Sequence, residues 1–165
     1  MSAPIRPSID QIKTSLQAAA AEARDSRSND VLTRTLMKHV GQLGQLLKWS
    51  VASGRYPDAD HLGDWLFDMT WYHADEQDQL LSLGLVLESE WGRYWADIRF
   101  DFEKLLIADA PIKVMVFDEV EDSVILFARL KERIKTYRGM RSGHTFLFAC
   151  FKGVKRDFEF DTFQP

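Results

Sequence analysis

Apolar residues in the first third of the chain recur at the spacing of α-helices. The first stripe consists of Ile9, Ile12, Leu16, Ala19 and Ala23, and the second of Leu32, Leu36, Val40, Leu43 and Leu47. Residues three or four positions apart lie on one face of a helix. Ser8 and Gln11 have the spacing of a capping box, in which each side chain binds the backbone N–H of the other. The pattern predicts helices over about 8–25 and 30–52, and Gly54 can cap the second.

Short apolar runs replace the helical pattern from residue 65 onward. Those with the length and composition of strands are 65–72, 83–91, 112–117, 144–151 and 154–163. Helical segments at about 93–109 and 120–138 lie between the later runs. Pro111 ends the first of them, because the residue before a proline disfavours the helical conformation. Asp118 and Glu121 are candidates to cap the second.

The order of these elements predicts an α/β fold with a mixed central β-sheet flanked by helices. The strand–helix–strand unit at 83–117 indicates a parallel crossover, whereas the hairpins indicate antiparallel pairs. A chain of 165 residues, 45% of them hydrophobic, has the size and composition of one ordinary domain. We expect a single domain, 1–165, with a helical part (8–52), a core (64–117) and a helix followed by a C-terminal β-hairpin (118–165).

The N-terminal segment and the cysteine content favour an intracellular, cytoplasmic protein. Residues 1–13 contain no apolar stretch typical of a signal peptide. No apolar run approaches the roughly 20 residues that span a bilayer, so we expect no membrane partner. Cys150 is the only cysteine, which excludes an internal disulfide and fits a reducing compartment.

Charge is distributed unevenly along the chain, although the net charge is only −4. Residues 57–122 carry 17 acidic and 4 basic side chains, whereas residues 129–156 carry 9 basic and 1 acidic. The basic segment could bind a polyanion such as nucleic acid, while the acidic segment binds cations. Two solvated faces are the simpler interpretation, because charge runs usually indicate only that.

Two glutamates on the second predicted strand are the first candidates for a functional site. Glu88 and Glu90 are two residues apart, so they project from the same face of a strand. The opposite face carries Leu85, Leu87 and Trp91. Like charges at this separation repel, and burial removes their hydration. Solvent, a bound cation or a shared proton must offset that cost.

Asp68 extends this pair to a cluster of three carboxylates. If the runs 65–72 and 83–91 form a hairpin, residues whose numbers sum to about 155 face each other, and Asp68 then lies opposite Glu88. Like charges in that position destabilise a sheet. The cluster is therefore a candidate site for Mg²⁺ (or Mn²⁺), which prefers oxygen ligands, with Asp64 as an alternative first ligand. A solvent-exposed sheet face with alternating acids is the competing interpretation.

The arrangement of Asp68 and Glu88-Ser89-Glu90, followed by a helix and the strand 112–117, resembles the PD-(D/E)XK nuclease superfamily. That family has an αβββαβ core, with an Asp on one strand and (D/E)-x-K on the next, and it uses Mg²⁺ to cleave phosphodiester bonds. The resemblance covers residues from about 30 to 117. It implies a restriction-endonuclease-like core preceded by N-terminal helices.

The chain departs from the family motif at several positions. Phe67 stands where the motif has proline, and Glu90 replaces the usual lysine. Some restriction endonucleases have a Glu at that position, and in other members the lysine has moved to the following helix. Lys104 is the candidate for such a lysine, and Lys113 is a weaker one. A first core strand before residue 65 is not evident; it would be short, within 55–63, or absent.

Metal-assisted hydrolysis of nucleic acid is the activity that the resemblance implies. Asp68 and Glu88 would bind Mg²⁺. Glu90 would be a further ligand or the base, and Lys104 would stabilise charge on the phosphate. The nucleic-acid backbone would be held by basic residues that include Arg129, Arg133, Arg138 and Arg141.

Other functions remain compatible with the same residues. A non-catalytic relative could retain the fold and bind a partner instead, because the motif lysine is missing from its usual position. The carboxylate pair could also serve other acid–base chemistry, such as glycoside hydrolysis, although acids on one strand are not the usual arrangement for it. Assembly into a homo-oligomer, or binding of a protein partner, through the aromatic strands is compatible with either function.

Overall fold

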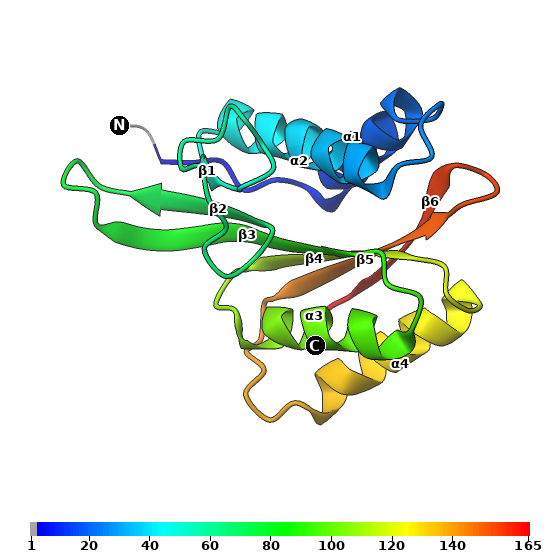
Figure 1. The fold of residues 1–165 in the computed structure, drawn as a ribbon. Helices are drawn as coiled ribbons and strands as arrows, with labels where there is room; N and C mark the ends of the chain where they lie inside the picture. Colours follow the sequence, from blue (N-terminus) through cyan, green and yellow to red (C-terminus); the bar gives the residue numbers. More distant parts are fainter. Residues whose placement is uncertain (1–2) are drawn as a thin grey trace.

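The computed structural model describes residues 3–165 as three layers, with a six-stranded sheet between two pairs of helices (Figure 1). The helices are α1 (Ile9–Glu22), α2 (Asn29–Leu46), α3 (Trp95–Ile107) and α4 (Ser123–Thr136). The strands are β1 (Ser50–Ala52), β2 (Met69–Ala74), β3 (Leu80–Glu90), β4 (Ile112–Asp118), β5 (Thr145–Lys152) and β6 (Asp157–Phe163). The strands cross the sheet in chain order, and β3, β4 and β5 are parallel while the other pairs are antiparallel. The α/β class and the mixed sheet are therefore confirmed.

Polar side chains cap the beginnings of α1, α2 and α4. The capping box of α1 is present, because Ser8 Oγ accepts from Gln11 N at 3.1 Å and Gln11 Oε1 accepts from Ser8 N at 2.9 Å. Asp122, rather than Asp118 or Glu121, caps α4, because its carboxylate reaches a free N–H of the first turn. No helix within residues 3–165 is both long and apolar enough to cross a bilayer.

The second helix is shorter than the sequence predicts. It ends at Leu46, and Lys48 adopts a left-handed conformation (φ 68°) that interrupts the helix. Residues 50–52 then form β1, which pairs antiparallel with β2. The prediction failed because Val51 continues the apolar spacing of the helix. The sequence predicted that a first strand would be short, within 55–63, or absent. The strand exists, but it lies before that segment, at Ser50–Ala52.

The β2–β3 hairpin has the predicted register but different ends. The first paired residues are Met69–Leu87, Thr70–Val86 and Trp71–Leu85, whose numbers sum to 156. Residues 65–68 form no strand, and β3 begins at Leu80 rather than at residue 83. A strand through 65–72 would place Phe67 on the same face as Met69 and Trp71, but Phe67 packs instead in the core that contains Val86. The other six elements lie within three residues of their predicted bounds.

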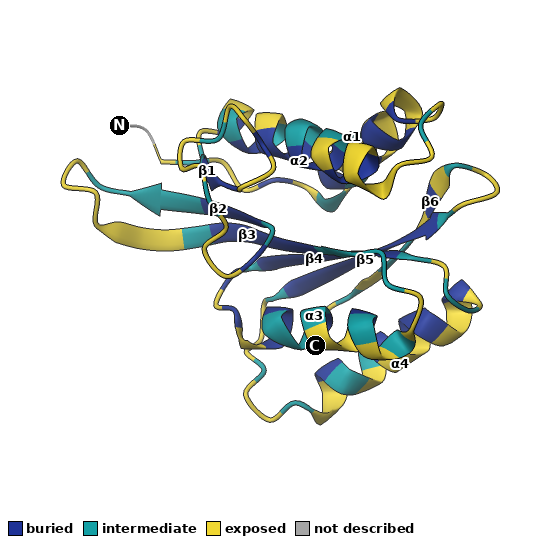
Figure 2. Cartoon of the chain, viewed as in Figure 1, coloured by how far each residue is buried: buried dark blue, intermediate teal, exposed yellow. Residues whose placement is uncertain are grey.

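Two apolar cores fill the spaces on either side of the sheet (Figure 2). Alternate residues of the central strands belong to different cores: Leu87 and Val114 face α1 and α2, whereas Val86 and Met115 face α3 and α4. A charged residue on the Val86 face of β3 consequently lies between the sheet and α3. Glu88 occupies that position.

Gly44 allows α2 to lie directly on the indole ring of Trp71. A Cβ atom at position 44 would come within 2.7 Å of that ring, and Trp71 is fully buried, so the core cannot easily yield. We expect Gly44→Ala to lower the free energy of unfolding by about 1–3 kcal/mol, although alanine favours helices. Chemical denaturation measures the change. Gly153→Ala is the control, because a Cβ there meets no atom within 4 Å; equal losses in both variants would contradict the packing argument.

Candidate active site between β3 and α3

Glu88 of β3 and Lys104 of α3 are in direct contact. The Glu88 side chain is 2% exposed, and Lys104 Nζ lies 2.8 Å from its Oε1. The same ammonium lies 2.9 Å from Asp101 Oδ1, one helical turn earlier. Because the Lys104 side chain is 28% exposed, it connects the buried carboxyl group to solvent.

Burial dominates the protonation of this pair. It raises the pKa of Glu88 to about 8, against the opposing contact with Lys104, and the charge of Asp68 raises that pKa further. Burial alone would lower the pKa of Lys104, but its contacts with Glu88 and Asp101 outweigh that effect and raise it. The site thus combines a carboxyl group that is costly to ionise with a lysine that is charged at neutral pH.

Glu90 and Asp101 form a second carboxyl pair beside the first. Burial and the hydrogen bond with Asp101 raise the pKa of Glu90, while the Gly92 N–H, which donates to Glu90 Oε1, opposes the rise. Asp101 therefore contacts both Lys104 and Glu90. The charge of Asp101 thus adds to the cost of ionising Glu90.

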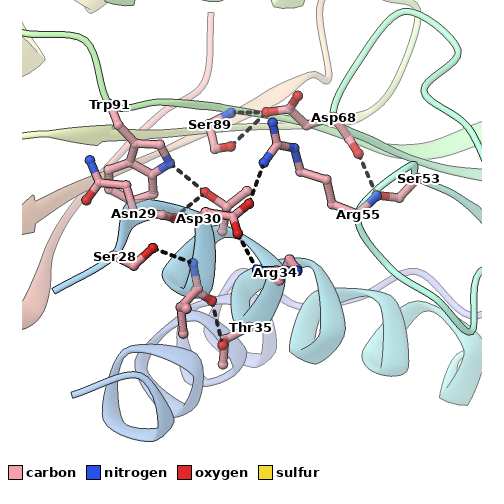
Figure 3. Close-up of polar contacts among 12 residues, drawn as sticks. Ser28, Asn29, Asp30, Arg34, Thr35, Ser53, Arg55, Asp68, Ser89 and Trp91 are labelled. Carbon is pink, nitrogen blue, oxygen red and sulfur yellow. Dashed lines mark hydrogen bonds and ion pairs between the residues drawn. The ribbon is translucent and has the colours of Figure 1, made fainter. Parts of the chain in front are cut away.

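Asp68 lies immediately before β2 and is held by Ser89 of the adjacent strand (Figure 3). Its Oδ2 accepts hydrogen bonds from Ser89 N at 2.8 Å and from Ser89 Oγ at 2.7 Å. Ser53 Oγ donates to Asp68 O at 2.8 Å. Because Asp68 precedes the strand, the pleat does not direct its side chain, and Oδ2 turns to Ser89 instead of standing beside Glu88. Asp68 still acts on Glu88 through its charge.

Within residues 3–165, two buried oxygen atoms on the α3 face of the hairpin, Thr70 Oγ1 and Glu88 Oε1, accept no well-oriented hydrogen bond, although Lys104 Nζ lies 2.8 Å from Glu88 Oε1. Thr70 pairs with Val86, so its side chain is diagonal to Glu88. No three side chains of His, Cys, Asp or Glu within residues 3–165 form a ready metal site. Mg²⁺ is commonly held by one or two carboxylates together with waters and substrate phosphates. Glu88 fits that role, since a cation would offset the cost of ionising it, whereas Asp68, whose Oδ2 accepts from Ser89 on the other face of β3, would have to turn to join it.

The two weaker candidates from the sequence have other surroundings. Asp64 Oδ1 accepts a hydrogen bond from Gly54 N at 2.7 Å and thereby ties together the two ends of the loop between them. Lys113 lies at the start of β4 and is 1% exposed. Its Nζ is 3.5 Å from Leu106 O, in the last turn of α3.

The effect of burial on pKa and stability can be tested at Lys113 independently of Glu88. Burial lowers the pKa of Lys113 to about 8 from its ordinary value of 10.5, against the opposing charge of Asp109. Between these values the unfolded chain binds a proton that the folded chain does not, so stability rises with pH across the window. We expect Lys113→Met to raise the free energy of unfolding at pH 7 by roughly 2 kcal/mol, after loss of the contact with the Phe146 ring. Denaturation at pH 7 and pH 10 measures this; a variant with the pH dependence of the wild type would contradict it.

The predicted nucleic-acid-binding arginines lie in and after α4, on the other side of α3 from Lys104. The ion pairs are Arg129–Glu121, Arg133–Glu103 and Arg141–Asp109, whereas Arg138 is exposed. Each acid in these pairs belongs to the acidic segment 57–122, so the two oppositely charged segments partly neutralise each other. Phosphate binding by these arginines stays a prediction.

Three residues that the sequence patterns left without a role belong to this site: Asp101, Ser89 and Thr70. Asp101 precedes Lys104 by three positions on a helix, and this spacing was the signal that could have identified it. Ser89 and Thr70 carried no comparable signal, because their roles depend on the pairing of β2 with β3.

Comparison with known proteins gives no assignment. The chain matches no protein-family model, no curated protein and no solved structure. A functional assignment accordingly rests on the contacts and charges within the chain.

Proposed function

We propose that the chain is a Mg²⁺-dependent nuclease of the PD-(D/E)XK type in which the catalytic lysine is supplied by α3. The contact of 2.8 Å between Lys104 Nζ and Glu88 Oε1 carries the proposal. The motif position for lysine holds Glu90, but a lysine from the following helix reaches the same buried carboxyl group. The resemblance requires a lysine side chain beside the metal-binding glutamate, and Lys104 would fill that role.

The order of elements supports the same proposal. From α2 to β4 the chain runs helix, three strands, helix, strand, which is the αβββαβ order of the family core. The strand β1 supplies the member that was not evident in the sequence. Asp68 lies before the second of these strands, and Glu88 lies near the end of the third.

The side chains have complementary roles in phosphodiester hydrolysis. Asp68 and Glu88 would hold Mg²⁺, which when bound lowers the pKa of a water molecule and neutralises charge on the phosphate. Lys104, already charged and partly exposed, would donate a hydrogen bond to a phosphate oxygen as negative charge develops there. Glu90, with its raised pKa, would accept the proton of the attacking water. Ser89 would keep Asp68 oriented through its two hydrogen bonds.

One observation favours a non-catalytic alternative. Glu88 is almost fully buried and already has a cationic partner, so the pair could serve only to stabilise the packing of α3 on β3. In that case the chain would be a nuclease-like interaction module. Removal of one member of a buried pair would then unfold the protein without revealing an activity.

Cleavage of labelled single- and double-stranded DNA and RNA in Mg²⁺, Mn²⁺ or EDTA tests the proposal. We expect the wild type to cut at least one substrate only when a divalent cation is present. Asp68→Ala and Glu88→Ala should reduce the rate by about 100-fold or more, with folding verified by circular dichroism. Asp64→Ala decides between the two candidate first ligands. No cleavage by folded wild type with any substrate and either cation would leave the interaction module as the better account.

A further inference from the structure

A small polar cavity lies at the opposite end of the parallel strands from Glu88 and Glu90. It has a volume of about 170 Å³, and its lining includes Leu106, Asp109, Tyr137, Gly139, Arg141 and His144. These residues belong to the end of α3, the segment that follows it, and the connection between α4 and β5, which lie together at one end of the sheet (Figure 1). The cavity is therefore separate from the candidate active site.

The ammonium group of Lys113 lies next to this cavity, and its hydrogen bonding is incomplete. The side chain is 1% exposed, and its acceptor is the carbonyl of Leu106, a cavity-lining residue, at the long distance of 3.5 Å. The Phe146 ring, 4.9 Å from Nζ, gives further partial compensation. An ammonium group has three donors, and a buried charge without full hydrogen bonding is costly. An additional acceptor at this position would stabilise the charged form.

His144 adds a buried nitrogen that has no hydrogen-bond partner among the described residues. Its ring lines the cavity and its side chain is 11% exposed, yet Nδ1 has no hydrogen bond within the part of the chain that the structure describes. The ring lies within electrostatic range of Lys113, whose charge lowers the pKa of His144 after the larger effect of burial. His144 Nδ1 thus has no partner within residues 3–165, and Lys113 Nζ has one long hydrogen bond.

Arg141 and Asp109 complete the charges around the cavity. Arg141 is exposed at the rim and pairs with Asp109 Oδ2 at 2.8 Å. Asp109 Oδ1 lies 3.7 Å from His144 Nε2. Asp109 is exposed and shared between two basic side chains, so its charge compensates Lys113 and His144 only in part. Basic groups therefore outnumber acidic ones at this cavity.

We propose that this cavity binds a small oxyanion with the chemistry of phosphate or sulfate, held by the lining residues His144 and Arg141 and stabilised by the charge of Lys113, whose Nζ contacts the carbonyl of the lining residue Leu106. Such an anion has several acceptor oxygens, which can accept hydrogen bonds from Arg141 and, in the tautomer protonated at Nδ1, from His144. The site does not depend on the proposed nuclease activity, since it uses none of the same residues.

Proton uptake should accompany binding. Burial lowers the pKa of Lys113 to about 8, and a bound anion would favour the charged ammonium. Arg141 remains charged throughout, and Asp109 stays at the rim in both states. Sulfate does not titrate in this range, so its affinity should fall as the pH is raised above about 8 because Lys113 must first bind a proton.

Isothermal titration of sulfate into the full chain tests the proposal, at constant ionic strength with chloride as the replaced anion. We expect saturable binding that weakens by roughly tenfold or more in Lys113→Met and less in Arg141→Gln, an exposed substitution that leaves the core intact. Lys131→Met, which removes a lysine from a different surface, should bind as the wild type does. Adenosine monophosphate as a second titrant distinguishes a phosphate ester from a free oxyanion as the ligand. Absence of saturable sulfate binding, or equal binding by wild type, Lys113→Met and Arg141→Gln, would overturn the proposal.

Discussion

Replacing Lys104 with methionine is expected to reduce metal-dependent cleavage by about 100-fold or more while leaving the protein folded. Methionine retains most of the apolar stem but removes the charge that lies 2.8 Å from Glu88. The loss should appear in the single-turnover rate, because the ammonium acts on the charge that develops in the transition state. The rate on the substrate that the wild type cleaves best measures the effect.

Lys131→Met is a matched control for this substitution. The Lys131 side chain is 30% exposed, compared with 28% for Lys104, and it also contacts a carboxylate, that of Asp161. It lies on α4, away from Glu88, and its loss should leave the cleavage rate unchanged. Equal rates in the two variants would contradict a catalytic role for Lys104.

Glu88→Gln is expected to stabilise the protein above pH 8 even though it abolishes activity. The folded-state pKa of Glu88 is raised to about 8 from an ordinary 4.5, so the folded chain keeps a proton that the unfolded chain releases between these values. The stability associated with Glu88 is therefore complete below pH 4.5 and is lost as the pH rises to 8. A neutral amide avoids that loss, which is on the order of 4 kcal/mol.

Urea denaturation of both proteins at pH 5 and pH 9 measures this difference. Glu88→Gln should raise the free energy of unfolding only slightly at pH 5 and strongly at pH 9. Glu159→Gln is the control, and it should lower the free energy of unfolding at pH 9. Ser123 and Lys152 lower the pKa of Glu159, so its ionised form contributes to stability. A loss of stability in Glu88→Gln at pH 9 would indicate that its charged pair with Lys104 stabilises the fold.

The sequence predicted those features that depend on local pattern. Apolar runs located β3, β4 and β5, and period-two alternation placed Leu87 and Glu88 on opposite faces of β3. Hairpin symmetry gave the register of the first β2–β3 pairs, because antiparallel pairing fixes the sum of the residue numbers. Lys104 was identified as a candidate from its place on the helix after β3.

Features that depend on tertiary structure could not be derived from the sequence. The crossover of α3 over β3 brings Lys104 to Glu88, and no local spacing specifies that contact. β1 was missed because three residues after an apolar helix have no strand pattern of their own. Pairing of the arginines with acids of a distant segment, such as Arg133 with Glu103, requires α3 and α4 to pack side by side.

Binding of Mn²⁺ to the wild type, Asp68→Asn and Glu88→Gln, measured by electron paramagnetic resonance at several pH values from 6 to 9, tests most directly whether these carboxylates form a metal site. Mn²⁺ is a spectroscopically visible substitute for Mg²⁺, and the ligand Glu88 must be ionised to bind it. The expected result is binding to the wild type that strengthens as the pH rises to about 8 and weakens by about tenfold or more in each variant. Wild type that binds no Mn²⁺, or variants that bind it equally well, would contradict a metal-dependent active site between β3 and α3.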